Sequence, residues 1–464
     1  MGVWDSERRA LTVGLVMTVT LVAFEGLAVA TIMPEVRADL GGIRLYGWAF
    51  SAFFLTSLVS TVMAGRAADR AGVGRPFTVG VVLFGIGLAI GASAPTMLVL
   101  VAGRAVQGLG AGAVSAAAVT TVARGYPDDL RPRMFAVMST AWVVPGLLGP
   151  AVSGVVADTV GWRWVFAGLL PLIVVAGGVA VPRLRQLPAA AESAGAVAPS
   201  NARVAILLAV AAGVLLAGLG EHRLLLAVPL VLGGIAGVIP ALNRLLPAGT
   251  LRARPGLPAA VLLKGVLTFA FFGTDAYISL AVTDVRHHSV TVAGLALTAA
   301  TLTWTTGAWI HAHRSGRVAP RTLIATGMTL IAIGIALMVV GLNASAPLAI
   351  IVLAWGVAGL GMGISNQSVI LAVLAEAPAG QEGTASSFQQ LADLLGVATG
   401  TGVVGAVIAV GQAATWTRAD SLRVGFAITL AMAVIGVLLT RRLAVSGRNE
   451  PAATAALPPA PLWG

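Results

Sequence analysis

Residues 10–33 read ALTVGLVMTVTLVAFEGLAVATIM, and Glu25 is the only charged side chain in this run. A helix needs about 20 mainly apolar residues to cross the roughly 30 Å of hydrocarbon in a bilayer. The stretch therefore predicts a transmembrane helix that carries a carboxylate near its centre. Its length exceeds the apolar core of a secretory signal, and no small-residue cleavage site follows it, so we expect it to be retained.

The composition extends this interpretation to the whole chain of 464 residues. Hydrophobic residues make up 58% and charged residues only 10%, against about 25% charged residues in soluble domains. These values exclude a disordered chain, a nucleic-acid-binding tail and an ordinary cytosolic enzyme. Cysteine is absent, which excludes disulfide bonds, cysteine zinc sites and thiol nucleophiles. The net charge of +11 comes from arginines spread among short loops, as the cytoplasmic loops of membrane proteins require.

The apolar windows predict an all-α polytopic membrane protein with 14 spans in a six, two and six order. The windows are 10–33, 46–65, 77–95, 97–122, 134–157, 162–181, 203–219, 224–241, 259–282, 291–311, 321–342, 347–374, 384–410 and 422–440. A β-barrel is excluded because the windows lack its alternating pattern. We expect an N-terminal bundle over 1–181, a linker with two extra spans over 182–256, a C-terminal bundle over 257–442, and a disordered cytoplasmic tail over 443–464.

A repeat links the two six-span groups. Residues 65–75 read GRAADRAGVGR after the second span, and residues 307–317 read GAWIHAHRSGR at the matching place in the last six. Both begin with glycine near a helix end and continue into a basic, glycine-containing turn. Duplicated halves are how many secondary transporters are built.

Three motifs make the sequence resemble the major facilitator superfamily, and within it the 14-span drug:proton antiporters. The residues that carry the resemblance are Gly65, Asp69, Arg70, Gly72 and Arg75 in the first loop; Arg104, Gln107, Gly108, Gly110 and Gly112 in the fourth window; and Gly146, Gly149, Pro150, Ser153 and Gly154 in the fifth. The third motif is similar to the antiporter signature, although Ser153 replaces a glycine and Pro145 replaces another. In the second half, His311 stands where the first half has Asp69.

The resemblance implies two six-helix bundles that rock about a central cavity. We expect the two extra spans at the periphery and, because their only charges are terminal (Arg203, Glu221 and Arg223), without a transport role. The resemblance implies gating by the first-loop residues Gly65, Asp69, Arg70, Gly72 and Arg75, and by Gly146, Gly149, Pro150 and Gly154 in the fifth window. The implied activity is proton-coupled efflux of hydrophobic or cationic small molecules. A transporter of an endogenous metabolite or lipid, and an uncoupled facilitator, are the alternatives on the same fold.

Three carboxylates, Glu25, Asp275 and Asp393, lie deep in apolar windows. A charge in the hydrocarbon costs at least about 2.5 kcal/mol, so such a group faces a cavity, pairs with another charge or takes up a proton. We interpret all three as candidate proton-coupling residues, and hydrogen-bonded structural carboxylates are the alternative. Arg104 is the fourth candidate, because a permanent cation resets the proton affinity of a nearby carboxylate. An anchor to backbone carbonyls is the other interpretation of Arg104.

Other polar and aromatic residues of the spans are candidates for substrate contacts, because pockets for organic cations combine apolar walls with cation–π faces. The candidates are Phe24, Glu25, Gln107, Trp142, Phe272, Asp275, Tyr277, Trp304, Trp355, Asn366, Gln367, Gln389 and Gln390. Packing against lipid or the core is the alternative for each aromatic residue. We expect Lys264 to extend its ammonium to the membrane interface, and His311 and His313 to belong to a loop.

No enzyme, cofactor or metal site is indicated. The sequence has no phosphate-binding Gly-Lys-Ser/Thr loop, no cluster with metal-ligand spacing and no paired nucleophile and base. A membrane-embedded enzyme or sensor lacks a supporting polar cluster. The expected partners are a small-molecule substrate, protons and the lipid bilayer, without nucleic acid, and we expect a monomer.

Basic residues predict the orientation in a plasma or inner membrane. Roughly three times as many fall on one set of loops as on the other, and this set includes Arg66, Arg70, Arg75, Arg314 and Arg317. A reporter protein fused after Arg448 should therefore be active in the cytoplasm. A periplasmic signal from the same fusion would reverse the topology.

Overall fold

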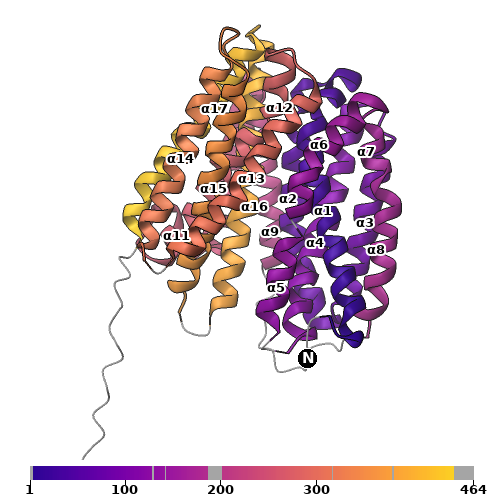
Figure 1. Ribbon diagram of the computed structural model, residues 1–464. Coiled ribbons are helices and arrows are strands. Elements are labelled where there is room, and N and C mark those ends of the chain that lie inside the picture. The colour runs from indigo at the N-terminus through magenta and orange to yellow at the C-terminus, as the bar shows by residue number, and fades with distance from the viewer. Residues whose placement is uncertain are drawn as a thin grey trace, which may run out of the picture.

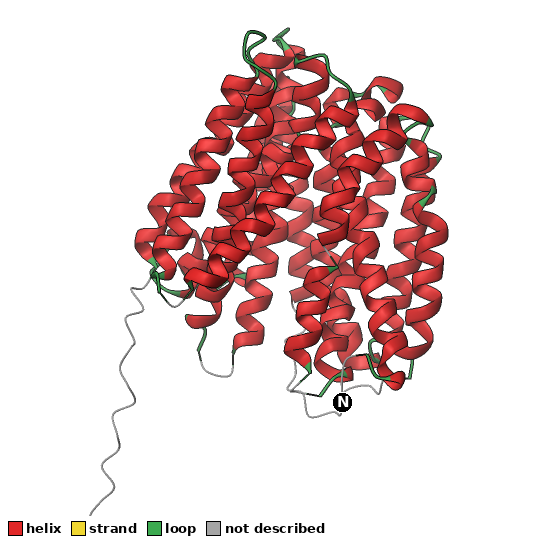
Figure 2. Ribbon diagram, viewed as in Figure 1, coloured by secondary structure: helices red, strands yellow, loops and turns green. Residues whose placement is uncertain are grey.

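The computed structural model describes residues 4–127, 130–141, 143–186, 201–315, 317–378 and 381–443. Within these ranges the chain is helical, and the one β-bridge joins Ser315 to Val318 without forming a strand (Figure 2). The predicted tail from residue 444 onward lies outside the described residues, as does Trp142.

Long helices follow one another through the chain and lie nearly side by side (Figure 1). The first group is α1 (Ser6–Leu40), α2 (Trp48–Ala71), α3 (Gly74–Ala92), α4 (Met97–Gly125), α5 (Arg131–Thr140), α6 (Val143–Thr159), α7 (Arg163–Ala167) and α8 (Leu169–Leu184), with the 3₁₀ turn η1 (Ile43–Leu45). The second is the pair α9 (Asn201–Leu219) and α10 (Leu224–Leu245), followed by the 3₁₀ turn η2 (Thr250–Arg252).

The last group completes the helical array. It comprises α11 (Leu257–Asp275), α12 (Ile278–Leu280), the π-helical turn η3 (Ala281–Val285), α13 (Val290–Arg314), α14 (Pro320–Gly341), α15 (Ala349–Ala375), α16 (Glu382–Ala413), α17 (Arg418–Leu439) and the 3₁₀ turn η4 (Thr440–Arg442). We call α1–α8 the first half and α11–α17 the second half. The start of α1 lies at the terminal face of the molecule, and the α1–α2 turn lies at the opposite, distal face (Figure 1).

Twelve of the described helical segments are long and apolar enough to cross a membrane. The windows at 134–157 and 291–311 are the two predicted spans outside this set. In the first, the structure has two shorter helices, α5 and α6, with residue 142 between them undescribed. The second corresponds to α13, a 25-residue helix whose threonines lower its hydropathy. The all-helical class predicted from the sequence is confirmed, with 12 to 14 candidate spans.

Short local signals set the helix ends. Gly41 and Gly42 both have φ near +68°, a left-handed backbone that glycine adopts without strain, and they end α1 and begin the turn to α2. Side-chain hydroxyls cap three later helices: Thr96 accepts from the Val99 N–H, Ser289 from the Val292 N–H, and Thr417 from the Asp420 N–H. All three capped helices begin at the distal face.

The extra pair of helices does not lie wholly at the periphery, contrary to the expectation from the sequence. Helix α9 packs against α2 of the first half and α16 of the second half, whereas α10 packs on α9 and is mostly exposed. Leu55 of α2, Leu216 of α9 and Ala398 of α16 belong to one buried cluster. We call this line of contact the α9 seam.

Helices α6 and α13 join the two halves through their backbones at another place. A Cβ atom on Gly154 would lie 3.0 Å from the Thr291 Cα, and one on Gly294 would lie 2.6 Å from the Pro150 carbonyl oxygen. Gly146 faces the side chain of Thr301. Gly149 instead faces Phe24 and Leu27 of α1 at ordinary van der Waals distance. Small residues therefore let the two helices approach closely.

Replacement of Gly154 by leucine should separate α6 from α13, because the added side chain meets backbone rather than a movable group. We expect a cost of about 1–3 kcal/mol to the closed distal arrangement, and a lower transport rate. The measurement is substrate flux and thermal stability of the purified variant. Gly233→Leu in α10 is the matched control, since nothing lies within 4 Å of its added Cβ. Equal behaviour of the two variants would contradict the role of the α6–α13 contact.

Candidate functional site

The carboxylates predicted from the sequence occupy three separate clusters. Glu25 lies with Arg104 and Gln107 in the first half, whereas Asp275 and Asp393 lie in two different settings in the second half. The partner of the carboxylate differs from cluster to cluster. The three carboxylates therefore differ in how readily they can bind a proton or a ligand.

Glu25 and Arg104 form a fully buried ion pair between α1 and α4. Both residues are 1% exposed. Gln107 joins them, since its Oε1 accepts from Arg104 at 3.0 Å and its Nε2 donates to Glu25 Oε1 at 3.2 Å. Arg104 also donates to the Ala49 carbonyl at 3.0 Å and lies over the Phe53 ring at 4.3 Å. The anchor to backbone and the pairing with a carboxylate, which the sequence left as alternatives, therefore coexist.

One carboxylate oxygen of Glu25 has no hydrogen-bond partner among the described residues. Every contact named above uses Oε1, and Oε2 is buried without a hydrogen-bond partner among the described residues. An unsatisfied carboxylate oxygen in an apolar interior is costly, and a bound proton removes the charge that makes it so. The cluster therefore contains one atom at which a proton can be taken up while Oε1 remains bound.

Asp275 sits at the end of α11 beside an aromatic cluster. The Trp355 indole N–H donates to Asp275 Oδ1 at 2.8 Å. The Phe271 ring stacks on Trp355 with centroids 4.8 Å apart and meets Trp304 edge-on at 5.6 Å. Phe272 lies 6.2 Å from Trp304. Of the predicted substrate residues, Trp355 thus contacts the carboxylate directly, and Trp304 and Phe272 belong to the same aromatic cluster through Phe271. A carboxylate with a neutral indole partner beside aromatic rings suits an organic cation.

Asp393 pairs with Lys264, and the expectation for Lys264 is wrong. Lys264 is 3% exposed instead of extending to the interface. Its Nζ lies 3.1 Å from Asp393 Oδ1 and 2.5 Å from Asn366 Oδ1. The buried length of α11 and the acceptors on α15 and α16 hold the ammonium inside the second half. Asp393 itself is 34% exposed, so the protein encloses this pair only in part.

The remaining predicted substrate residues are dispersed. Tyr277 is fully buried near the distal face, where its hydroxyl donates to the Thr401 carbonyl at 2.6 Å and its ring packs on Tyr46. Phe24 faces Gly149. Gln367 and Gln389 are half-buried. Gln390 lines a cavity of about 380 Å³ between α2 and α16, together with Gly65 of the first loop.

The first-loop residues lie at the terminal end of α2. Arg70 and Arg75 are exposed, Gly72 is buried, and the side chain of Asp69 lies outside what the structure describes. His311, expected in the matching loop of the second half, is buried in α13, and its Nδ1 lies 2.8 Å from the Ser368 hydroxyl. The expectation of a loop position is therefore wrong for His311, and the Ser368 hydroxyl gives its imidazole a polar partner inside the bundle.

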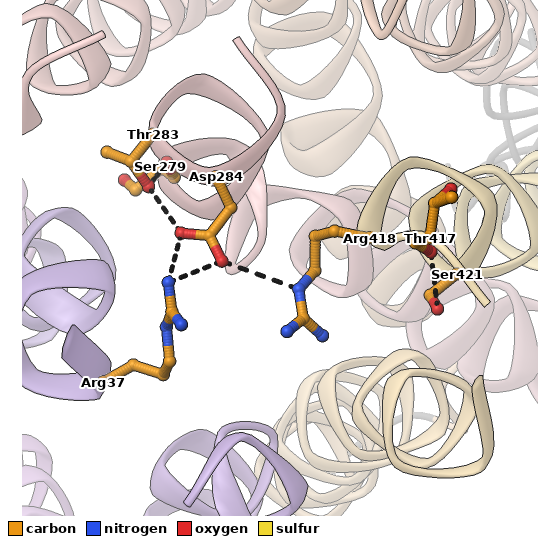
Figure 3. Close-up of polar contacts among 7 residues, drawn as sticks. All are labelled: Arg37, Ser279, Thr283, Asp284, Thr417, Arg418 and Ser421. Atoms are coloured by element: carbon orange, nitrogen blue, oxygen red, sulfur yellow. Dashed lines mark hydrogen bonds and ion pairs between the residues drawn. The ribbon is translucent and has the colours of Figure 1, made fainter. Parts of the chain in front are cut away.

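An ion-pair network at the distal face escaped the sequence analysis. Arg37 at the end of α1 donates to both carboxylate oxygens of Asp284 at 2.6 Å, and Arg418 Nε lies 3.5 Å from Asp284 Oδ2 (Figure 3). Asp284 is in η3, so one carboxylate joins the first half to α17 of the second half. Its position beside an outer loop made it look like an ordinary exposed acid, and only three-dimensional proximity identifies it.

Other polar contacts between the halves lie nearby. Ser51 donates to the Ala398 carbonyl at 2.8 Å, and Asp158 accepts from both the N–H and the hydroxyl of Thr291. These contacts, like the Asp284 network, lie toward the distal face. The helices of the two halves diverge toward the terminal face (Figure 1), where the 380 Å³ cavity lies. The structure is therefore closed at the distal face.

Comparisons with known proteins identify the family. A model of the major facilitator superfamily matches residues 15–280, which is more than half of the chain. The chain belongs to the major facilitator superfamily. It is therefore a multi-pass membrane protein of a family whose relatives and structural neighbours are transporters rather than enzymes, and the resemblance inferred from the three motifs is confirmed.

Two relatives within the superfamily are named as multidrug transporters. It is 28% identical to a protein named as a probable multidrug-efflux transporter of Mycobacterium tuberculosis, over 90% of this chain and 91% of the relative. It is 29% identical to the multidrug transporter protein MdtP of Bacillus subtilis over 37% of this chain and 32% of that protein.

Solved structures show the same fold at low sequence identity. A D-xylose–proton symporter aligns with a TM-score of 0.68 and 15% identity, over 95% of this chain and 99% of the other. An auto-inhibited peptide transporter aligns with a TM-score of 0.65 and 17% identity, over 96% and 99%.

Replacement of Asp284 by asparagine should open the distal face more often, because Arg37 and Arg418 would then repel each other without a shared anion. Hydrogen bonds to charged groups contribute about 1.5–3 kcal/mol each, enough to shift a two-state equilibrium about tenfold or more. Fluorescent labels on Pro95→Cys and Ala344→Cys, in exposed distal turns of the two halves, report the separation, and the chain has no other cysteine.

Asp39→Asn is the matched control for this measurement. It removes the same charge from an exposed ion pair with Arg163 that lies within the first half. An unchanged distance distribution in the Asp284→Asn variant would show that the network does not hold the distal face closed.

Proposed function

We propose that this protein is a proton-coupled efflux transporter of hydrophobic or cationic small molecules, located in the plasma membrane with both termini in the cytoplasm. The observation that carries the proposal is the buried Glu25–Arg104–Gln107 cluster with its unpartnered Glu25 Oε2. The relative at 28% identity, named as a probable multidrug-efflux transporter, supports the class of cargo. The basic residues at the terminal face support the orientation.

In this mechanism the Glu25 carboxylate takes up and releases a proton, while Arg104 keeps the Glu25 side chain in position. With the proton on Oε2, the cluster keeps the charge of Arg104 alone. After the proton leaves, the pair is neutral overall. The two states therefore differ by one charge at a buried site between α1 and α4, and such a difference biases the equilibrium between two conformations. Gln107 fixes Oε1, so that protonation is directed to Oε2.

The substrate binds, in this proposal, at the aromatic residues around Asp275. A lipophilic cation would gain a cation–π contact with Trp304 or Trp355 and an ion pair with Asp275, which lacks a cationic partner among the described contacts. Phe272 adds apolar wall. Asp393, paired with Lys264 and partly exposed, is the second proposed proton site.

Gating in the proposal uses both faces. Gly146, Pro150 and Gly154 lie on the side of α6 that contacts α13 and seal the halves there, and Gly149 lets α6 pack on α1 within the first half. The segment from Gly65 to Arg75, which is the end of α2 and the start of α3, acts in this proposal at the terminal face, where the two halves diverge. A monomer contains every residue that this mechanism uses.

The test is pH-gradient-driven flux in proteoliposomes made with a lipophilic cationic dye, a neutral dye or a fluorescent lipid. We expect Glu25→Gln to abolish accumulation driven by the gradient while it retains substrate exchange without a gradient. Asp275→Asn should lower both activities for the cation and spare the neutral dye. Asp393→Asn should weaken coupling. Asp39→Asn, in the same helix as Glu25 and exposed, is the control.

Three results would reject the proposal or replace it. Wild-type dependence on the pH gradient in all three variants would remove the carboxylates from coupling. Flux of the lipid alone would favour a lipid or metabolite transporter. Flux that persists unchanged after the gradient is collapsed would favour an uncoupled facilitator.

A further inference from the structure

A cavity of about 750 Å³ opens at the distal face, away from the three carboxylate clusters. Its walls come from four places in the chain: the turn between α1 and α2, the end of α9, the end of α16 and the start of α17. Both halves and the extra helix pair therefore contribute to one site. Close contact between Gly47 and Gly405 packs α2 onto α16 at the wall of the cavity, because a Cβ on Gly47 would lie 2.7 Å from the Gly405 Cα.

Three arginines line this cavity: Arg37 from α1, Arg44 from η1 and Arg418 from α17. Two carboxylates accompany them, Glu221 in the wall and Asp284 behind it. Hydrogen bonds from the backbone N–H groups of Arg223 and His222 hold the pKa of Glu221 below its ordinary value, so Glu221 is an anion at neutral pH. Three permanent cations thus face two anions, and the cavity has one positive charge in excess among the described residues.

The donors of these arginines are incompletely used. The Nε atom of Arg37 is buried without a hydrogen-bond partner in the described part of the chain, and the Nε atom of Arg418 has only the long 3.5 Å contact to Asp284. Figure 3 shows the two terminal nitrogens of Arg418 pointing away from Asp284, which only Nε approaches. Arg44 contacts the His222 ring at 3.2 Å. The guanidinium groups of these arginines have more N–H donors than nearby acceptors. An anion bound in the cavity would supply the missing acceptors.

The opposite wall is apolar and carries an aromatic ring. Trp48, Leu216, Ala406 and Ala409 line it. The lining residues coincide with the ends of five candidate spans, those that begin at Ile43 and Arg418 and those that end at Leu40, Leu219 and Ala413. Such positions lie at the level of lipid headgroups, where tryptophan is common. The site therefore combines cationic donors with an apolar surface at the depth of the membrane interface.

We propose that this distal cavity binds a phosphate group carried on an amphiphile, with Arg44 and Arg418 as its principal contacts. Guanidinium groups suit phosphate because their fork of N–H donors matches its oxygens, and a tetrahedral anion accepts from donors that arrive from several directions. An anion held by Arg44 of the first half and Arg418 of the second would join the halves. Occupancy would therefore stabilise the arrangement that is closed at the distal face. This site is independent of the proposed transport reaction.

A lipid headgroup and a soluble phosphate share this chemistry, and two probes separate them. The full-length protein is purified in detergent, and its melting temperature is measured with phosphatidylglycerol, with phosphatidylcholine or with inorganic phosphate. Lipid binding is counted in parallel by native mass spectrometry. Stabilisation by phosphatidylglycerol alone would identify a lipid headgroup. Stabilisation by inorganic phosphate as well would identify a general phosphate site, and both results support the proposal.

Two kinds of variant locate the site. Arg44→Gln and Arg418→Gln should each weaken phosphatidylglycerol binding by about tenfold, as expected for loss of a charge-assisted contact. Ala217→Trp keeps every charge but fills the cavity that Ala217 lines, and it should also abolish the stabilisation. Arg223→Gln is the control, because Arg223 lies at the same face and does not line the cavity.

The proposal fails in either of two cases. In one, neither phosphatidylglycerol nor phosphate stabilises the wild-type protein more than phosphatidylcholine does. In the other, Arg223→Gln loses binding as strongly as Arg44→Gln, which would mean that general surface charge and not this cavity attracts the anion.

Discussion

A charge inside a helical bundle that is surrounded by hydrocarbon must find a partner within the protein, because no water is there to solvate it. This constraint organises the structure. Arg104 has Glu25, Gln107, a backbone carbonyl and an aromatic face; Lys264 has Asp393 and Asn366. Removal of one partner from such a group costs more than the pair itself contributes to stability. The positions of these few charges therefore determine which helices must remain adjacent, and they also mark where chemistry can occur.

The helical class and the family could be read from the sequence, since long apolar windows and three glycine-rich motifs are local signals. The pairing of Glu25 with Arg104 could be suspected, because both are buried charges of opposite sign. The partner of Lys264 could not be found in this way. Its nearness to the start of a helix favoured the interface, whereas the side chain turns inward to acceptors more than a hundred residues away. Short-range patterns do not reveal such contacts.

Asp284 is a second residue whose partners could not be predicted from the sequence. By sequence it is one acid near a polar turn, yet its carboxylate lies between Arg37 and Arg418, which come from the two ends of the chain. The glycine motif in α6 was easier to interpret, because glycines at helical spacing indicate close packing wherever they occur. The structure adds the partner: Gly146 and Gly154 face α13, while Gly149 faces α1. The role of each glycine therefore depends on a neighbour that the motif does not specify.

Helix α9 contacts both halves, and its two surfaces differ. Toward α2 it presents Gly213 to the large ring of Trp48, whereas toward α16 its Leu216 rests on Gly402 and its Gly220 on Ala406. A bulky side chain on small residues can slide along them, but a ring lodged against a helix resists displacement. If the halves rock as proposed, α9 would move together with the first half and would slide along the surface of α16. Lipid would then be kept out on that flank throughout the cycle.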